Sequence, residues 1–201
     1  MDLVVRFDHK EVRVLTDVVL LDRLPDLGRR ERRAERRRLA HLDALSARLA
    51  ELHAIRALLE QTGEVVNTGW VQGAWFTVAS ASGDRAVMAY DVSLAIERPV
   101  TGACVVGAVV QAAGGPATVR SQLVQRTLDL TWHALREDLS RPVHWCPGPR
   151  MRVMQVLELT HWNDAPERTK EDVVDLLHAA GEVGDVQLHM CRARQMVLTT
   201  P

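Results

Sequence analysis

Residues 29–61 contain neither proline nor glycine and almost no β-branched side chain. Alanine, leucine, arginine and glutamate dominate the stretch, and all four favour the α-helix. The sequence therefore predicts one long, Arg-rich amphipathic helix over residues 29–62, about 50 Å in length at about 1.5 Å per residue. Gly63 follows as the expected C-cap. A helix of this length must either project from its domain or be shared with a partner.

Four leucines mark the apolar side of this predicted helix. At about 100° per residue they fall within an arc of about 80°, and their 3-4-3 spacing is that of a coiled-coil seam. We call this set the leucine seam: Leu42, Leu45, Leu49 and Leu52. Two heptads are too few to predict a coiled coil on their own. We interpret the leucine seam as an interface with a partner or with a second copy of the chain.

The predicted helix begins with "RRERRAERRR", which holds seven arginines and two glutamates. Six of the arginines cover one broad face opposite the leucine seam. We call this set the arginine face: Arg29, Arg30, Arg32, Arg33, Arg36 and Arg37. Like charges at i,i+4 cost roughly 0.2–0.5 kcal/mol per pair, and cations are unfavourable at a helix N-terminus. Two interpretations stay open: a solvated helix face, or a surface that an anionic partner stabilises.

The arginine face predicts an interaction function and leaves the class of partner open. Guanidinium groups bind carboxylates and phosphates through a planar fork of donors. No aromatic residue lies within Arg29–Arg38, so a nucleic acid would be held through its phosphates with little sequence preference. We therefore expect a non-enzymatic interaction or assembly protein that binds an acidic protein surface or self-associates. A nucleic-acid-binding accessory protein that uses Arg29–Arg38 is the alternative.

The remaining segments predict a mainly α fold: a single helical domain with one long N-terminal helix and a small sheet (α+β). "LVVRF" and "VRVLT" flank a polar break and predict a hairpin within residues 1–28. Residues 63–201 predict a helical core, in which Thr169 and Asp172 form a capping box and Gly181 ends the last helix. The tail "DVQLHMCRARQMVLTT" has a strand-like composition. We expect it to pair with the N-terminal hairpin, so that the sheet comes from the terminal segments.

Composition restricts the cellular setting. Hydrophobic residues make up 47% of the chain and charged residues 25%, values typical of a soluble globular protein. No apolar run approaches the roughly 20 residues that span a bilayer, and the first residues lack the layout of a signal peptide. Three cysteines cannot form a complete disulfide framework. We therefore expect a cytoplasmic protein with reduced thiols and no transmembrane segment.

Three motifs follow one another along the chain: "GWVQGA" (69–74), "CVVGAVVQAAGG" (104–115) and "HWNDAPERTKEDVVDLLHAAG" (161–181). Together they resemble a family of small, uncharacterised actinobacterial domains with a Gly-Trp helix end, a C-x-x-G-A helix and a W-N-D-x-P turn. The resemblance covers roughly residues 49–181. It implies a shared helical core, and it carries over no catalytic residue, because the family has no established activity.

Signals for catalysis or for a bound metal are weak. No dinucleotide, phosphate-loop or zinc-protease motif is present in the sequence, and close packing explains the glycines of residues 102–115 better than a phosphate site. His161 and Asp164 have no nucleophile at a diagnostic spacing, so we assign no catalytic residue and expect no cofactor. Two H-x-C elements could supply four zinc ligands if both were extended: His144, Cys146, His189 and Cys191. Burial is the expected role of these cysteines, which leaves a small metalloprotein or enzyme as the second alternative.

Overall fold

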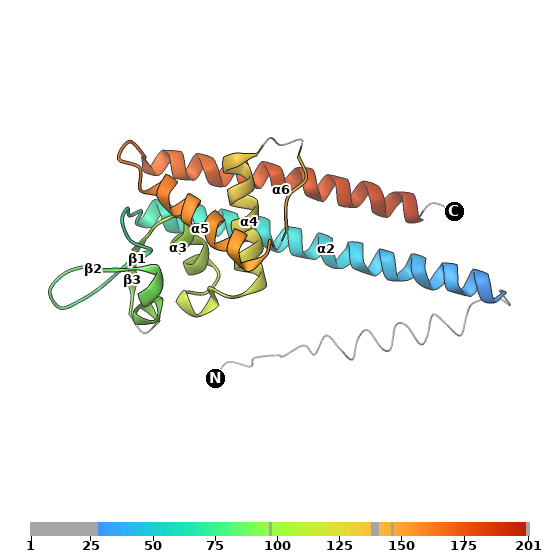
Figure 1. Cartoon of the computed structure of the whole chain (residues 1–201), viewed down its shortest axis with the longest axis horizontal. Helices are drawn as coiled ribbons and strands as arrows, with labels where there is room; N and C mark the ends of the chain where they lie inside the picture. The colour runs from blue at the N-terminus through green and yellow to red at the C-terminus, as the bar shows by residue number, and fades with distance from the viewer. Residues whose placement is uncertain (1–27, 97, 138–140, 146, 200–201) are drawn as a thin grey trace. The chain divides into compact units, whose positions relative to one another are not determined.

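A computed structural model describes residues 28–96, 98–137, 141–145 and 147–199 of the chain (Figure 1). The described residues are mainly helical and include one small antiparallel sheet, so the predicted fold class is confirmed. In chain order the elements are α2 (Arg29–Thr68), β1 (Phe76–Val78), β2 (Arg85–Val87), η1 (Ala89–Ala95), β3 (Val100–Ala103), α3 (Val105–Ala112), η2 (Pro116–Thr118), α4 (Gln122–Arg136), α5 (Pro149–Asn163) and α6 (Lys170–Thr199).

The chain divides into two compact units, Met1–Ala44 and Leu45–Pro201. In the first unit the structure describes residues 28–44, which contain the first turns of α2. The hairpin predicted within residues 1–28 lies outside the described residues. The second unit contains the rest of α2, the sheet and helices α3 to α6.

Helix α3 is the centre of the second unit. Every residue from Val105 to Val110 is buried, as expected of a helix that is apolar around its whole circumference. It contacts α4, α5 and β3. Complete burial of one aliphatic side chain stabilises a fold by roughly 1.5–3 kcal/mol, so this short helix supplies a large share of the core. Around it lie Ile55, Leu58, Val66, Phe76, Leu130, Leu159 and Val173.

Helix α2 confirms the predicted long helix, but Gly63 does not end it. The helix continues to Thr68 because its last turns still carry core residues, such as the fully buried Val66. The chain leaves the helix at Gly69, where a side chain would not fit. A Cβ at Gly69 would lie 2.4 Å from the carbonyl oxygen of Thr101 in β3.

The sheet has the strand order β2-β1-β3, and both pairings are antiparallel. Phe76 of β1 pairs with Val87 of β2 and with Ala103 of β3, and its side chain is fully buried. The turn "SASGD" joins β1 to β2, and Gly83 within it has a φ of 108°, a conformation that favours glycine. All three strands come from residues 76–103. The prediction that the sheet is built from the terminal segments is therefore wrong.

Helix α6 shows why the predicted C-terminal strands are wrong. It begins with the predicted capping box: the Thr169 N–H donates to Asp172 Oδ2 (2.9 Å), and the Asp172 N–H donates to Thr169 Oγ1 (3.2 Å). Gly181 lies inside the helix, which continues to Thr199. Leu188 and Cys191 of the tail are buried in a cluster with residues of α2, and this packing outweighs the strand propensity of the tail.

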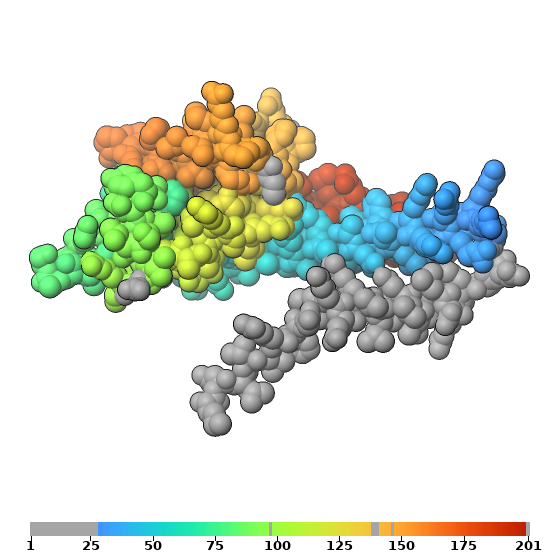
Figure 2. All heavy atoms as spheres, turned by 60° about the horizontal axis from the view of Figure 1, so that its bottom comes forward, coloured from blue at the N-terminus to red at the C-terminus, as the bar shows by residue number. Residues whose placement is uncertain are grey.

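Helices α4 and α5 pack against each other and against α3, and Figure 2 shows α5 at the surface in orange. Arg152 of α5 links the two helices, because it donates to the Gln125 carbonyl (2.9 Å) and to the buried carboxylate of Asp129 (3.1 Å). None of the described helices combines the length and the apolar character needed to cross a membrane.

Candidate functional site

The arginine face lies in the first unit, on the first turns of α2. The Gly28 N–H donates to Glu31 Oε2 (2.8 Å), so a carboxylate occupies the first helical turn, where the helix dipole favours negative charge. Glu35 accepts two hydrogen bonds from Arg38 (2.8 and 2.9 Å), and this pairing holds the pKa of Glu35 below its usual value. Both glutamates of the block are therefore engaged with groups outside the arginine face.

All six side chains of the arginine face are exposed. Within the part of the chain that the structure describes, none of them forms an ion pair. A solvated helix face is usually crossed by pairs of opposite charge at i,i+4, and this face has none among the described residues. Its assignment as a partner-binding surface stays a prediction.

The leucine seam packs against α6 of the same chain for most of its length. In the second unit a small apolar cluster joins the two helices, and Leu49 packs against this cluster. The buried members are Leu45, Leu52, Leu188 and Cys191. Leu42 belongs to the first unit and is half-buried. Helix α6 thus takes the position of a coiled-coil partner along this part of the seam, and a role of the seam in self-association stays a prediction.

The H-x-C elements do not form the predicted pair of extended arms. Cys146 lies outside the described residues, and His144 is exposed. The second element lies within α6, where residues two positions apart point in different directions. His189 is accordingly exposed and Cys191 buried, so the extended geometry predicted for this element is wrong. The described residues contain no group of three His, Cys, Asp or Glu side chains that could hold a metal ion.

The three sequence motifs meet at one buried side chain, that of Asn163 at the end of α5. Its Oδ1 accepts hydrogen bonds from Trp70 Nε1 (2.9 Å) and from the backbone N–H of Val105 (3.0 Å). Its Nδ2 donates to the carbonyl of Val71 (3.1 Å). We call these four residues the Asn163 junction. Because Asn163 is fully buried, one amide joins the segment after α2, the start of α3 and the end of α5.

Asp164 extends this junction and does not form a catalytic pair with His161. Its Oδ1 accepts from the backbone N–H of Gly73 (2.9 Å) and from Asn163 Nδ2 (2.8 Å). Gln72 Nε2 donates to the Asn163 carbonyl (3.0 Å) and ties the same loop to the end of α5. The His161 side chain is exposed. These contacts are those of a structural turn.

The Asn163 junction lies within a domain that other proteins share. Residues 50–183 match the family described as "Family of unknown function (DUF6197)". The chain belongs to this family. The DUF6197 match confirms the resemblance to an uncharacterised domain family over roughly residues 49–181, and it includes all four residues of the junction. No curated protein and no solved structure matches the chain.

Cys104 caps α3 in the DUF6197 region. Its Sγ accepts a hydrogen bond from the backbone N–H of Gly107 (3.4 Å), and its side chain is fully buried. Burial raises the pKa of the Cys104 thiol to about 12. The group is therefore a neutral thiol at physiological pH.

We expect Cys104 to resist alkylation by iodoacetamide at about pH 8 in the folded chain, because the thiolate is the reactive form. In denaturant the thiol regains its ordinary pKa and should be alkylated. Mass spectrometry of the Cys104 peptide measures both rates, and equal rates would contradict the burial. The raised pKa of Cys104 also makes the stability of the fold depend on pH. The contribution of Cys104 to the free energy of unfolding is fully present below the ordinary pKa of 9.0. It is lost as the pH rises toward 12.

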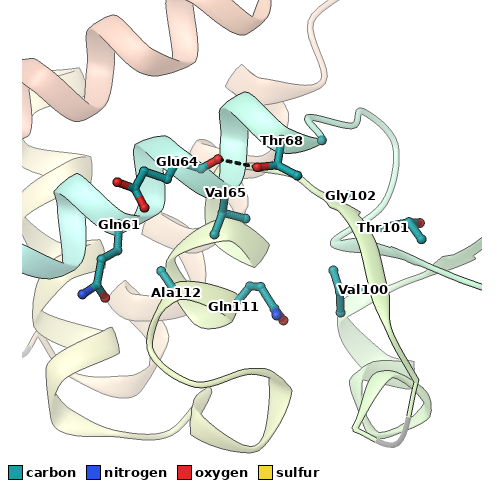
Figure 3. Close-up of a pocket in the computed structure, with 10 residues that line it drawn as sticks. Gln61, Glu64, Val65, Thr68, Val100, Thr101, Gly102, Gln111 and Ala112 are labelled. Atoms are coloured by element: carbon teal, nitrogen blue, oxygen red, sulfur yellow. Dashed lines mark hydrogen bonds between the residues drawn. The ribbon is translucent and has the colours of Figure 1, made fainter.

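A pocket of about 350 Å³ lies beside the junction, between the end of α2, strand β3 and the end of α3 (Figure 3). Figure 3 shows Gln111 extending from α3 toward Val100 of β3, with Val65 of α2 above it. A second cleft, of about 370 Å³, separates α2 from α6 and has Glu60 and Asp185 among its lining residues. Sequence reasoning named neither, because each is lined by segments that are far apart in the chain.

Sequence reasoning also missed an exposed apolar face on α5. Four side chains of this face are between 44% and 58% exposed: Met151, Val153, Met154 and Leu157. Apolar residues at such spacings normally indicate the side of a helix that faces the core, so the pattern alone could not reveal the exposure. Exposed apolar patches are typical of contact surfaces in soluble proteins.

Proposed function

We propose that this DUF6197 member is a non-enzymatic interaction protein that binds an acidic protein surface through its arginine face. The observation that carries the proposal is the set of six exposed guanidinium groups, none of which is paired among the described residues. The neighbouring carboxylates of Glu31 and Glu35 are already engaged. The face therefore keeps its positive charge for an external partner.

Two features favour a protein partner over a nucleic acid. Residues 28–44 contain no Phe, Tyr or Trp, so the arginine face lacks the large aromatic side chains on which proteins that bind single-stranded nucleic acids stack bases. The exposed apolar face of α5 is a second surface of the kind found at protein contacts. Carboxylates fit the planar donor fork of arginine as well as phosphates do.

The test is the binding of fluorescein-labelled poly-L-glutamate to the full chain over a series of salt concentrations. The test variant changes Arg32, Arg33, Arg36 and Arg37 to glutamine. We expect binding to weaken about tenfold or more, because each exposed ion pair contributes roughly 0.2–1 kcal/mol. Wild-type binding should fall as salt is added, since salt screens exposed charges.

A matched control removes the same charge from other exposed positions and should bind poly-L-glutamate like the wild type. It changes Arg85, Arg120, Arg150 and Arg194 to glutamine. Equal weakening by the two variants would reveal an effect of net charge alone and would contradict the proposal. Lack of wild-type binding at low salt would contradict it as well.

Labelled duplex DNA and RNA, titrated in parallel, test the nucleic-acid alternative. Each phosphate contact contributes roughly −0.9 to the slope of log K against log salt on duplex DNA. Tight, salt-dependent binding with a slope several units shallower in the test variant would favour a phosphate-binding face over a carboxylate-binding one.

A further inference from the structure

The cleft of about 370 Å³ between α2 and α6 has an apolar base, and we call it the α2–α6 cleft. Leu59 of α2 and Leu177 of α6 line it and are buried, and Val174 beside them is half-buried. Among the lining residues, carboxylates outnumber arginines by three to one. The charged lining residues are Arg56, Glu60, Glu182 and Asp185, and all four are exposed. The cleft is therefore an apolar groove with an acidic rim.

Arg56 offsets only part of the negative charge of this rim. It pairs with Asp185 and with Glu60, with 3.4 Å between Arg56 Nε and Glu60 Oε1. Glu171 is exposed as well, and it lies about four helical turns before Asp185, on the same side of α6. Within the residues that the structure describes, neither Glu171 nor Glu182 forms an ion pair. Negative charge thus remains along the cleft for a basic partner.

Two glycines keep the cleft open. Gly63 and Gly181 line it, and each lies inside a helix, where glycine is less favourable than alanine. A Cβ at either position would meet no atom within 4 Å, so packing within the chain does not require glycine there. The missing side chains instead leave room in the cleft for side chains from outside. This observation is independent of the charges, and it also indicates an occupant.

The arginine face matches the cleft in charge and in the character of its side chains. Its guanidinium groups can pair with the carboxylates of the rim through their planar fork of donors. The aliphatic stems of arginine cover apolar surface, which the cleft offers at Leu59 and Val174. The arginine face and one wall of the cleft belong to the same continuous helix, α2, which cannot fold back on itself. The matching occupant is therefore the arginine face of another copy of the chain.

We propose that the arginine face of one copy docks in the α2–α6 cleft of a second copy, head to tail. This inference rests on the proposed function, because it names the acidic surface that the arginine face binds. Each copy offers one arginine face and one cleft, so contacts of this kind join copies into open chains or close them into a ring. Because exposed ion pairs hold the contact, salt weakens it.

The first test is analytical ultracentrifugation of the full chain up to about 1 mM, which detects contacts with a Kd of about 1 mM or below. At low salt the mean mass should rise with concentration and pass that of a dimer, and about 0.5 M salt should return the chain to monomers. Changing Arg32, Arg33, Arg36 and Arg37 to glutamine should weaken the association about tenfold or more. The control variant that loses four arginines elsewhere should associate like the wild type.

A second variant fills the cleft and keeps every charge: Gly63→Leu combined with Gly181→Leu. It should weaken self-association about tenfold or more, because the added side chains occupy the space of the docked arginines. Its Tm should rise, since leucine favours a helix over glycine. Weaker association of a more stable chain cannot result from a damaged fold. As a matched control, Gly148→Leu adds a leucine at another position where a Cβ meets no atom, and it should associate like the wild type.

A mixture of the two variants tests the head-to-tail arrangement. The variant without the four arginines keeps an open cleft, and the cleft-filled variant keeps its arginine face. At a concentration where each alone is monomeric, an equimolar mixture should form 1:1 dimers and nothing larger, because only one of the two contacts can form. Both variants carry a net negative charge, so net charge does not draw them together.

Poly-L-glutamate separates a failure of this inference from a failure of the proposed function. The cleft-filled variant should bind it like the wild type. A wild-type chain that binds poly-L-glutamate but stays monomeric at low salt overturns the inference and leaves the proposed function standing. Lack of both kinds of binding overturns both. Self-association that is unchanged by filling the cleft overturns the inference too, because the arginine face would then bind elsewhere on the second copy.

Discussion

Replacing Gly107 with alanine should lower the free energy of unfolding by about 4 kcal/mol or more, or prevent folding altogether. A Cβ at this position would lie 2.0 Å from the carbonyl oxygen of Trp75 and 3.0 Å from its carbonyl carbon. The Trp75 backbone cannot easily move, because its N–H donates to the Val87 carbonyl (3.0 Å) and its carbonyl accepts from the Cys104 N–H (3.1 Å). The added methyl group must therefore push α3 away from the sheet, at the centre of the core.

Urea unfolding of the wild type and the variant measures this loss. Gly63→Ala is the matched control, since it makes the same chemical change inside α2, where a Cβ meets no atom within 4 Å. It should raise the free energy of unfolding by about 1 kcal/mol, because alanine favours the helix over glycine. A loss below about 1 kcal/mol for Gly107→Ala would contradict the close approach of α3 to β1, since buried clashes cost more than this.

Local signals were enough to predict the two longest helices, α2 and α6, in part. The stretch without proline or glycine predicts α2, and the capping box of Thr169 and Asp172 predicts the start of α6. Gly114 and Gly115, both with positive φ, follow α3, as glycines commonly do just after a helix. Each of these signals acts within about one helical turn, so it does not depend on the rest of the fold.

Gly63 and Gly181 show where local signals fail. Glycine is common just after a helix, and the sequence predicts a helix end at both positions. Both helices continue because residues beyond the glycines are buried, Val66 at 0% exposure and Leu188 at 3%. Burial of such a side chain outweighs the roughly 1 kcal/mol that glycine costs inside a helix. The burial depends on other elements, which the local sequence does not contain.

The leucine seam and the tail pack against each other, and neither contact could be predicted from its own local sequence. The sequence predicts an apolar seam on α2, which, from the sequence alone, we interpret as an interface with a partner or with a second copy of the chain. The partner found in the structure is the tail, whose Leu188 and Cys191 lie three residues apart on α6. This spacing suits a helix, although the composition of the tail is that of a strand. The helix forms because it packs Leu188 and Cys191 against the leucine seam.

The candidate sites differ in how far the sequence could define them. The arginine face is visible in the sequence because all of its residues lie within Arg29–Arg37 on one helix. The Asn163 junction is not, because the two donors to Asn163 Oδ1 are 93 and 58 residues away along the chain. The sequence could present it only as separate motifs. Only the fold brings together the parts of the junction and of the pocket beside it.

Asn163→Ala should lower the free energy of unfolding by about 3 kcal/mol or more, because each of three polar groups that loses its partner costs about 1–3 kcal/mol. These groups are the Trp70 indole N–H, the Val105 backbone N–H and the Val71 carbonyl. Alanine cannot reach any of them, and the fully buried site gives water little access. A typical domain has about 5–15 kcal/mol in total, so the variant should be marginal or unfolded.

Urea unfolding gives the global loss, and the indole N–H signal of Trp70 in a proton–nitrogen NMR spectrum gives a local readout. Loss of the hydrogen bond should shift that signal and speed its exchange with solvent even where the fold survives. Asn67→Ala is the matched control at an exposed position of α2, and it should change stability by no more than about 0.5 kcal/mol. Suppose that Asn163→Ala unfolds at the same urea concentration as the wild type and the Trp70 signal stays protected. Apolar packing alone would then hold the three segments together, and the Asn163 junction would not be the link between them.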